Sequence, residues 1–354
     1  MSRFISKEAV RLKPYTPGEQ PADMQYIKLN TNESPFPPAP GVVKAVSRAE
    51  IMKLNLYSDP ACAQLVEAIA KRNGLRPEQV MTGNGSDEIL SFAFRAFCGE
   101  GKGAAFPDVT YGFYKVWAAY YGIEAKIIPL KDDFTIDVND YMDFPGAIFL
   151  ANPNALTGVE LPVEQIRRLL DADRDRVVIV DEAYVDFGGE SCVPLLNRYD
   201  NLLVVQTFSK SRDLAGARLG FAMGCPELIA DLNRMKFSFN PYNINRLSIL
   251  AGAASMADEA YFRKCTAAIQ ENRARTVAEL ERLGFSVLPS KANFIFAKSP
   301  DFPGGELYRR LKQNGILVRW FDEPRIRDYY RITIGSAEQM ERLLEEIRRF
   351  LGEV

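Results

Sequence analysis

The chain has 354 residues, balances 44 Lys and Arg against 46 Asp and Glu, and contains no histidine. The near-neutral charge gives no broad attraction to nucleic acid or to a membrane surface. The missing histidine excludes a Ser-His-Asp relay, an imidazole-ligated metal site and a histidine pH switch built from this chain alone. Proton chemistry near neutral pH must therefore use Lys, Tyr, Cys, a carboxylate with a shifted pKa or a bound cofactor.

Cysteine usage and apolar runs predict the compartment. The five cysteines are scattered and form no CxxC pair, which indicates neither a disulfide framework nor a thiolate metal cluster. The N-terminus lacks the apolar core of a signal peptide, and no apolar run approaches the length of a membrane span. We therefore expect a cytoplasmic protein with buried free thiols and without a metal.

The first part of the chain predicts an arm followed by a large domain. Seven prolines within residues 1–40 are too many for regular elements and indicate an extended N-terminal arm, which could lie over a site or a partner subunit. From about residue 60, helical stretches alternate with almost uninterrupted apolar runs, which are typical of strands buried on both faces of a parallel sheet. These runs are 125–130, 147–152, 176–181, 201–207 and 220–224. We place the large domain at 41–250.

The remainder, 251–354, predicts a smaller α+β domain. A long helix through 260–283 is followed by short strands near 293–297, 316–319 and 330–334. The last helix opens with Ser336 and Gln339 in capping-box spacing, and its apolar stripe indicates packing. The expected fold class is thus α/β, with a mostly parallel sheet covered by helices, a smaller C-terminal domain and an arm.

Polar residues follow three of the predicted buried strands. Asn152 and Asn154 follow one run, Asp181 and Tyr184 the next, and Ser209 and Lys210 the third. Each group alone could simply begin a loop or cap a helix. Because ligands bind at the carboxyl ends of strands in open α/β sheets, the coincidence of three such groups favours one shared crevice.

Two of these residues carry specific chemistry. Lys210 follows an apolar strand and lies close in sequence to Arg212 and Arg218, and both effects lower the pKa of its amine. A neutral amine can form a Schiff base with an aldehyde, whereas the alternative is a solvated surface lysine. The Asp181 carboxylate, at the rim of a buried sheet, needs a partner. A protonated pyridine nitrogen would serve, and so would an N-cap or a salt bridge.

A glycine-containing segment precedes an apolar helix. Residues 83–88, Gly-Asn-Gly-Ser-Asp-Glu, would let the backbone approach a phosphate at a helix N-terminus, or would form an ordinary tight turn. The pattern matches neither the dinucleotide nor the nucleoside-triphosphate fingerprint. Ser209 and Arg218 could supply the hydroxyl and the guanidinium that a dianionic phosphate also requires.

Together these motifs resemble the fold-type I pyridoxal-phosphate aminotransferases. The resemblance rests on the run 180–184, Val-Asp-Glu-Ala-Tyr, and on 207–210, Thr-Phe-Ser-Lys, with Gly216 and Arg218 downstream. Residues 152–158, Asn-Pro-Asn-Ala-Leu-Thr-Gly, are similar to the family's NPNNPTG loop, with Ala155 and Leu156 replacing its second Asn and its Pro.

Within the family, the chain most resembles the histidinol-phosphate aminotransferases. The segments that carry this likeness are 29–35, 57–60, 83–88, 315–319 and 330–335. The resemblance implies transamination between L-glutamate/2-oxoglutarate and imidazole acetol phosphate/L-histidinol phosphate, in L-histidine biosynthesis, with pyridoxal 5'-phosphate as cofactor.

The resemblance also implies the site residues. Lys210 would hold the cofactor covalently, Asp181 would pair with its pyridinium nitrogen, and Asn154 and Tyr184 would bond its phenolate oxygen. Tyr111 would stack on the ring, although it could equally be a core residue beside its aromatic neighbours. The phosphate would be bound by Gly85, Ser86, Thr207, Ser209 and Arg218. Tyr57 would reach the cofactor of a neighbouring subunit, which implies a homodimer. The substrate would be bound by Arg331, Arg319, Tyr15 and Asn32.

Other functions use part of the same residue set. Threonine-phosphate decarboxylase and aromatic amino-acid aminotransferase would share the fold and the cofactor. A non-catalytic binder of a phosphate ligand or a Rossmann-type dehydrogenase could explain residues 83–86, but it would leave Lys210 and Asp181 without roles.

Overall fold

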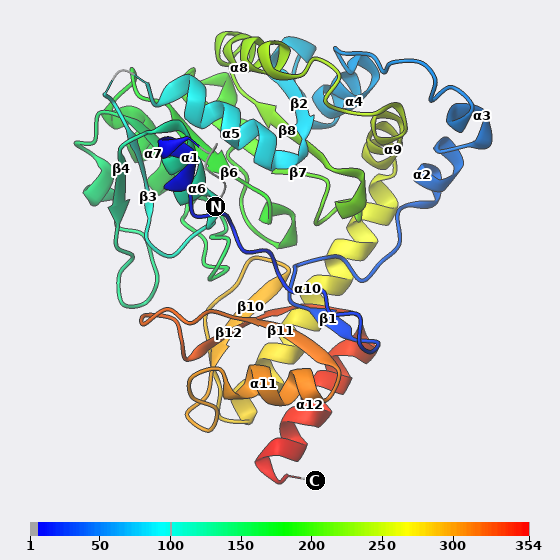
Figure 1. Ribbon diagram of the computed structural model, residues 1–354, viewed down its shortest axis with the longest axis vertical. Helices are drawn as coiled ribbons and strands as arrows, with labels where there is room; N and C mark the ends of the chain where they lie inside the picture. Colours follow the sequence, from blue (N-terminus) through cyan, green and yellow to red (C-terminus); the bar gives the residue numbers. More distant parts are fainter. Residues whose placement is uncertain (1–5, 100, 354) are drawn as a thin grey trace.

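The computed structural model describes residues 6–99 and 101–353, and two sheets organise them (Figure 1). The larger sheet has seven strands in the order β2-β8-β7-β6-β5-β3-β4. The bounds of these strands are β2 (Val80–Asn84), β3 (Ala104–Pro107), β4 (Ala125–Ile128), β5 (Ala147–Ala151), β6 (Val178–Asp181), β7 (Leu202–Thr207) and β8 (Leu219–Met223). All five predicted runs are therefore strands, and the expected fold class is confirmed. Burial on both faces was wrong for β4, because it is an edge strand that exposes Lys126 and Ile127.

Strand β8 departs from the expected parallel arrangement. The strands from β7 to β4 run parallel, whereas β8 is antiparallel to both β7 and β2. Residues 208–218, which connect β7 to β8, contain only the short 3-10 helix η5 (Ala215–Ala217) and are too few for a parallel crossover. Because of this reversal, the start of β8 lies beside the ends of β2 and β7.

Helices cover both faces of the larger sheet. One face carries α2 (Pro40–Ala45), α4 (Ala63–Asn73), α7 (Val163–Ala172) and α9 (Arg246–Ala257), and the other carries α5 (Gly85–Phe97), α6 (Phe113–Tyr121) and α8 (Pro226–Phe239). Within β6, Val178 and Val180 pack into the first core and Ile179 packs into the second. Burial on both faces explains why the strand sequence shows no alternation.

The smaller sheet has the order β1-β11-β12-β10-β9. Its strands are β1 (Ile27–Leu29), β9 (Ser286–Val287), β10 (Phe294–Lys298), β11 (Ile316–Trp320) and β12 (Tyr329–Thr333). The helices of this region are α10 (Glu259–Arg282), α11 (Glu306–Gln313) and α12 (Ala337–Leu351). The long helix α10, yellow in Figure 1, runs from the larger sheet to the smaller one. The Ser336–Gln339 capping box predicted for the last helix is present.

The N-terminal arm is more regular than its prolines predict. It contains α1 (Lys7–Val10) and β1, and β1 pairs in parallel with β11 of the smaller sheet. The expectation of no regular element was wrong here because residues 22–34 are free of proline and supply an apolar strand edge. At its other end the arm contacts the large sheet's helices, where Tyr15 stacks on Phe113 with ring centroids 4.3 Å apart.

The remaining short elements are α3 (Arg48–Ile51), η1 (Pro77–Gln79), η2 (Val138–Tyr141), η3 (Val185–Phe187) and η4 (Val193–Asn197). Four of the five cysteines are buried free thiols, namely Cys62, Cys98, Cys192 and Cys265. Within residues 6–99 and 101–353, no helix has the length and apolar character needed to cross a membrane.

Candidate active site

A cavity of about 840 Å³ lies where the strand ends of the larger sheet meet the arm and the smaller sheet. It gathers most of the residues that the sequence singled out. Those lining it are Tyr15, Asn32, Ser86, Tyr111, Asp181, Tyr184, Thr207, Ser209, Lys210, Arg218, Arg319 and Arg331. Gly85 and Asn154 lie beside the cavity without lining it, and Tyr57 lies outside it. The loops after β6 and β7 thus bring together side chains that are distant in sequence.

Lys210 presents a partly buried amine to this cavity. Its Nζ donates a hydrogen bond to the Thr31 carbonyl at 3.2 Å and lies 5.9 Å from the centroid of the Tyr184 ring. Burial, followed by the positive charge of Arg331, lowers the pKa of Lys210 to about 8. A substantial fraction of the amine is therefore neutral near physiological pH, as nucleophilic and basic chemistry requires.

Asp181 presents a buried carboxylate from the end of β6. Its hydrogen bonds come from two uncharged donors, the Ala183 amide and the Tyr114 hydroxyl, each at 3.2 Å. Burial is the largest cause that raises the pKa of Asp181 to about 7, and the negative charges of Asp87 and Glu182 act in the same direction. A carboxylate in this state gains stability from a cation placed against it.

The start of α5 forms a cradle of backbone and donor groups. Gly85 has φ +76°, and a Cβ on it would lie 2.7 Å from Nη2 of Arg218. The Gly85 amide is held by the Arg218 carbonyl at 3.0 Å, while Arg218 Nη1 lies 3.4 Å from the Ser209 hydroxyl. Thr207 donates to the same hydroxyl at 3.0 Å. Free helix amides, two hydroxyls and a guanidinium suit a dianionic phosphate.

Asp87 is a member of the site that sequence reasoning did not single out. Its carboxylate accepts a hydrogen bond from the Tyr111 hydroxyl at 2.5 Å and pairs with Arg218 at 3.3 Å. Burial, and then this carboxylate, hold the pKa of Tyr111 well above its ordinary value. Asp87 therefore connects the aromatic wall of the cavity to the phosphate cradle.

Two asparagines lie at or beside the cavity, Asn32 in its lining and Asn154 next to it. Asn32 donates to the Tyr184 hydroxyl at 3.0 Å and accepts from the Thr333 hydroxyl at 2.9 Å. The Asn154 side chain is buried and donates to the Val109 carbonyl at 2.9 Å, but its Oδ1 has no hydrogen-bond partner among the residues that the structure describes. A buried amide oxygen without a partner marks a position where a hydrogen-bond donor is missing.

Arg331 and Arg319 lie on neighbouring strands of the smaller sheet. Arg331 is partly buried, and its only hydrogen bonds within the described chain are long ones to the Ala155 and Asn30 carbonyls, at 3.4 and 3.2 Å. Its Nε has no partner within residues 6–99 and 101–353, and burial lowers the pKa of the guanidinium. Arg319 is more exposed and donates to the arm carbonyls of Thr16 and Pro17. Arg331 thus has donors available for an anion.

Tyr57 does not reach the cavity of its own chain. Its side chain is 80% exposed and stacks on Tyr242, with ring centroids 4.5 Å apart.

The fold and the cavity define a fold-type I pyridoxal-phosphate enzyme, and comparison with known proteins agrees. The sequence matches the family described as aminotransferase class I and II over residues 24–347. It is 48% identical over 349 residues to a protein named histidinol-phosphate aminotransferase from Brachyspira hyodysenteriae, with 98% of this chain and 99% of that protein covered. The chain therefore belongs to the class I and II aminotransferases and, within them, to the histidinol-phosphate aminotransferase family.

Solved structures show the same fold. A putative histidinol-phosphate aminotransferase from Erwinia carotovora atroseptica is 26% identical and superposes with a TM-score of 0.86, covering 93% of this chain and 96% of that one. The Sinorhizobium meliloti histidinol-phosphate aminotransferase in complex with pyridoxal-5'-phosphate is 24% identical, with a TM-score of 0.82 and coverage of 93% and 92%.

The cofactor of this enzyme is pyridoxal phosphate, and the residues at the site fit it. Asp181 is a buried carboxylate without a cationic partner among its hydrogen-bond donors. The Tyr184 hydroxyl accepts from Asn32 Nδ2 and so keeps its own proton to donate to an anion. At Gly85 the backbone lies so close to the Arg218 guanidinium that a side chain would collide with it. A ring nitrogen, a ring oxygen and a phosphate would satisfy these three features.

Proposed function

We propose that this enzyme transfers the amino group between L-glutamate/2-oxoglutarate and imidazole acetol phosphate/L-histidinol phosphate, in L-histidine biosynthesis. The observation that carries the proposal is that Lys210, Asp181 and three arginines line one cavity of about 840 Å³. Relatives that are 45–49% identical over nearly the whole chain carry the corresponding name, which supports this substrate choice.

In this proposal Asp181 and Lys210 carry the proton chemistry. The bound cofactor supplies a sink for the electrons released when the substrate Cα–H bond breaks. Asp181 keeps the ring nitrogen protonated by placing a negative charge against it. Lys210 anchors the cofactor covalently, and once the substrate has released its Nζ, the neutral amine removes the proton from the substrate Cα. One lysine is therefore anchor and base, and no imidazole is required.

The remaining cofactor contacts orient the ring. The Tyr184 hydroxyl and the Asn154 amide nitrogen would donate to the phenolate oxygen, and Tyr111 would stack on the ring face while Asp87 holds its hydroxyl at 2.5 Å. The phosphate is bound by the groups of the cradle, namely Gly85, Ser86, Thr207, Ser209 and Arg218.

The two amino donors share an anionic end, and Arg331 is placed to bind it. Its planar guanidinium can bind the glutamate carboxylate and, in the second half-reaction, the anionic end of the phosphorylated substrate. Arg319 is the second candidate for the same role. Tyr15 and Asn32 close the cavity from the arm, which Arg319 and β11 hold against the smaller sheet.

The enzyme is further proposed to be a cytoplasmic homodimer in which Tyr57 contacts the phosphate bound in the neighbouring subunit. Support comes from the apolar side chains exposed around Tyr57, which a second copy would cover. They include Ile51, Met52, Leu54, Leu56, Phe239 and Tyr242. We propose that the arm, the large domain and the small domain divide at residues 40 and 250.

The direct test is a substrate comparison on the cofactor-loaded enzyme. L-histidinol phosphate, L-phenylalanine and phosphothreonine are each supplied with 2-oxoglutarate, and the glutamate formed is measured. The proposal predicts the highest kcat/KM for histidinol phosphate. Carbon dioxide release from phosphothreonine without glutamate formation would instead identify a decarboxylase, and a strong preference for phenylalanine would identify an aromatic aminotransferase.

A further inference from the structure

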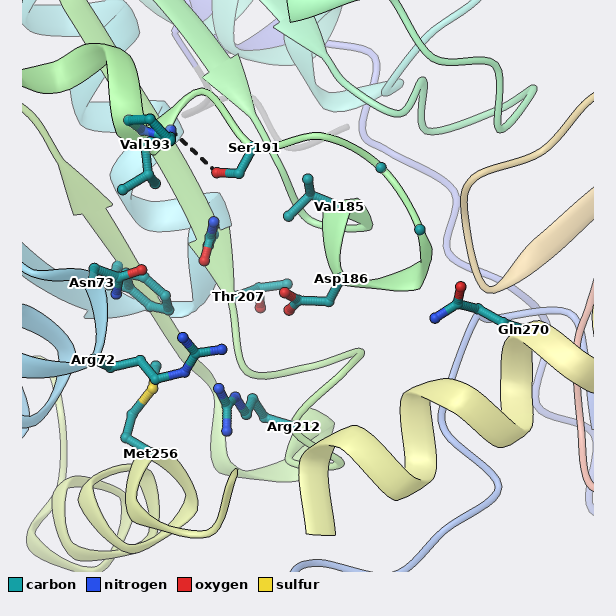
Figure 2. Close-up of a pocket in the computed structure, with 15 residues that line it drawn as sticks. Arg72, Asn73, Val185, Asp186, Ser191, Val193, Thr207, Arg212, Met256 and Gln270 are labelled. Carbon is teal, nitrogen blue, oxygen red and sulfur yellow. Dashed lines mark hydrogen bonds between the residues drawn. The ribbon is translucent and has the colours of Figure 1, made fainter. Parts of the chain in front are cut away.

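A second cavity, of about 450 Å³, lies on the far side of the strand end that carries Thr207. Figure 2 shows Arg72 and Arg212 reaching into it from one side, with Asp186 and Thr207 facing them and Gln270 contributed by α10. The residues after Thr207 form the loop that carries Lys210. The cavity therefore leaves space behind this loop, and close packing alone does not hold the loop in place there.

Polar contacts span this space and begin at the two residues that follow Lys210. The Ser211 hydroxyl donates to Asp186, which belongs to η3, two residues beyond Tyr184. Arg212 Nη1 donates to the Ser255 carbonyl at the end of α9, at 3.0 Å. The guanidinium also stacks on the Phe262 ring of α10, 3.8 Å from its centroid. The loop is thus tied to three separate elements.

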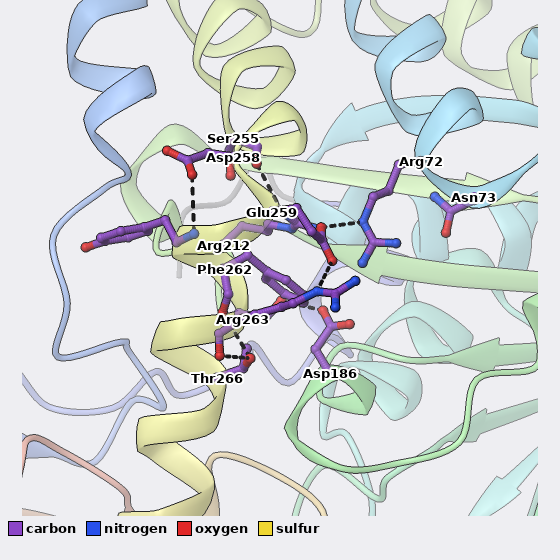
Figure 3. A network of polar contacts seen from close by, with 12 residues as sticks. Arg72, Asn73, Asp186, Arg212, Ser255, Asp258, Glu259, Phe262, Arg263 and Thr266 are labelled. Atoms are coloured by element: carbon purple, nitrogen blue, oxygen red, sulfur yellow. Dashed lines mark hydrogen bonds and ion pairs between the residues drawn. The ribbon is translucent and has the colours of Figure 1, made fainter.

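Arg212 is the buried member of an arginine cluster around one carboxylate. Figure 3 shows Glu259, at the start of α10, surrounded by Arg72, Arg212 and Arg263. The distances to the Glu259 carboxylate are 2.8 Å from Arg72, 3.1 Å from Arg263 and 3.6 Å from Arg212. Their side chains are 34%, 77% and 5% exposed, respectively. Only the buried Arg212 also belongs to the Lys210 loop, so its contacts transmit the position of α10 to that loop.

We propose that Arg212 is a positioning residue for Lys210, fixing the catalytic-lysine loop against α9 and α10 so that the Lys210 amine stays buried beside Thr31 and Tyr184. This inference rests on the proposed role of Lys210. Arg212 touches neither the cofactor site nor the substrate site, since it lines the second cavity and not the first. When Arg212 is lost, the second cavity gives the loop room to relax and water reaches the amine.

The test is the reactivity of Lys210 in the full-length chain without cofactor, followed by mass spectrometry. Trace labelling with acetic anhydride from pH 6 to pH 11 gives the pKa of each lysine. Wild-type Lys210 should titrate at about pH 8, because its amine is buried. In Arg212→Met the midpoint should rise by about one pH unit, a tenfold change in the neutral fraction at neutral pH. The Lys210 midpoint of Arg212→Lys should lie between those of the wild type and Arg212→Met.

Two further variants keep the test decisive. Arg72→Met removes a partner of the same Glu259 but no contact of the Lys210 loop, so its Lys210 midpoint should equal that of the wild type. Ser211→Ala removes the Asp186 hydrogen bond without touching a buried charge, and it should raise the midpoint by a smaller amount. If Arg212→Met fails to fold, the comparison of Ser211→Ala with wild type decides. If Arg212→Met folds and its Lys210 titration midpoint equals that of the wild type, the inference is overturned. If Arg212→Met does not fold, an unchanged Lys210 midpoint in Ser211→Ala overturns it.

The labelling result is separable from the proposed reaction, because no substrate or cofactor is present. A wild-type enzyme that fails to form glutamate from histidinol phosphate would refute the proposed substrates and leave the labelling comparison valid. In the loaded enzyme, Arg212→Met should lower kcat about tenfold with KM for glutamate unchanged, since Arg331 and the anion contacts are untouched.

Discussion

The buried carboxylate of Asp181 gives a quantitative prediction for the cofactor-free chain. Its pKa rises from 3.8 to about 7 on folding, chiefly because it is buried. The folded state therefore binds more protons than the unfolded state between about pH 4 and pH 7. The stability contributed by the protonated form is complete below about pH 4 and is lost as pH rises through 7. At 1.36 kcal/mol per pH unit, the total is about 4 kcal/mol.

Asp181→Asn removes this titration while keeping the side-chain shape. In urea unfolding of cofactor-free protein, the stability of the variant relative to wild type should increase by about 3 kcal/mol between pH 5 and pH 8. With pyridoxal phosphate bound, the ring nitrogen supplies the missing cation. At pH 8 the free energy of unfolding of the variant should then no longer exceed that of the wild type, or should be lower. The affinity of the variant for the cofactor should also fall.

Glu182→Gln is the matched control. Burial also raises the pKa of Glu182 to about 7, but its carboxylate accepts from Ser191, Cys192 and Gln206 and does not line the cavity. Without cofactor, the stability of Glu182→Gln relative to the wild type should rise with pH by a similar amount. With cofactor bound, this rise in relative stability should remain. The reasoning is refuted if the Asp181→Asn difference is independent of pH, or if cofactor changes both variants equally.

Three other substitutions test separate parts of the site. Lys210→Ala should lower glutamate formation by at least about a thousandfold, because anchor and base are lost together, while the circular dichroism spectrum stays native. Arg331→Lys should raise KM about 10- to 100-fold for both glutamate and histidinol phosphate, since a planar two-point contact is lost, whereas a rise for only one substrate would contradict the shared-anion role. Gly85→Ala should weaken cofactor binding at least about tenfold in a fluorescence titration. The reason is that the new Cβ would lie 2.7 Å from Arg218, at a φ of +76° that disfavours a side chain. Unchanged binding would exclude a phosphate cradle at this turn.

Periodicity predicted the central strands because β5, β6 and β7 are buried on both faces and show the expected apolar runs. It did not single out β2 and β3, whose sequences, Val-Met-Thr-Gly-Asn and Ala-Ala-Phe-Pro, contain glycine, proline and small residues. These strands are stabilised by pairing with partners elsewhere in the chain. The antiparallel direction of β8 was likewise set by the short connection from β7.

The site shows the same division between local and long-range signals. Lys210, Asp181 and Asn154 follow buried strands, so their convergence could be predicted from the sequence. Asp87 was not predicted, because its partners Tyr111 and Arg218 lie 24 and 131 positions away. The bond from Asn32 to Tyr184 spans 152 positions. The Asp87 contacts require knowledge of how distant loops of the larger sheet meet, and the Asn32 contact requires knowledge of how the arm meets that sheet.

The central claim is that the strand ends create one cofactor site whose anchor is Lys210. The most direct measurement is borohydride reduction of the pyridoxal-phosphate-loaded enzyme, followed by proteolysis and mass spectrometry. The account predicts one added cofactor per chain, located on Lys210, and no such adduct when glutamate is added before reduction. Attachment at another lysine, or no stable attachment at all, would contradict it.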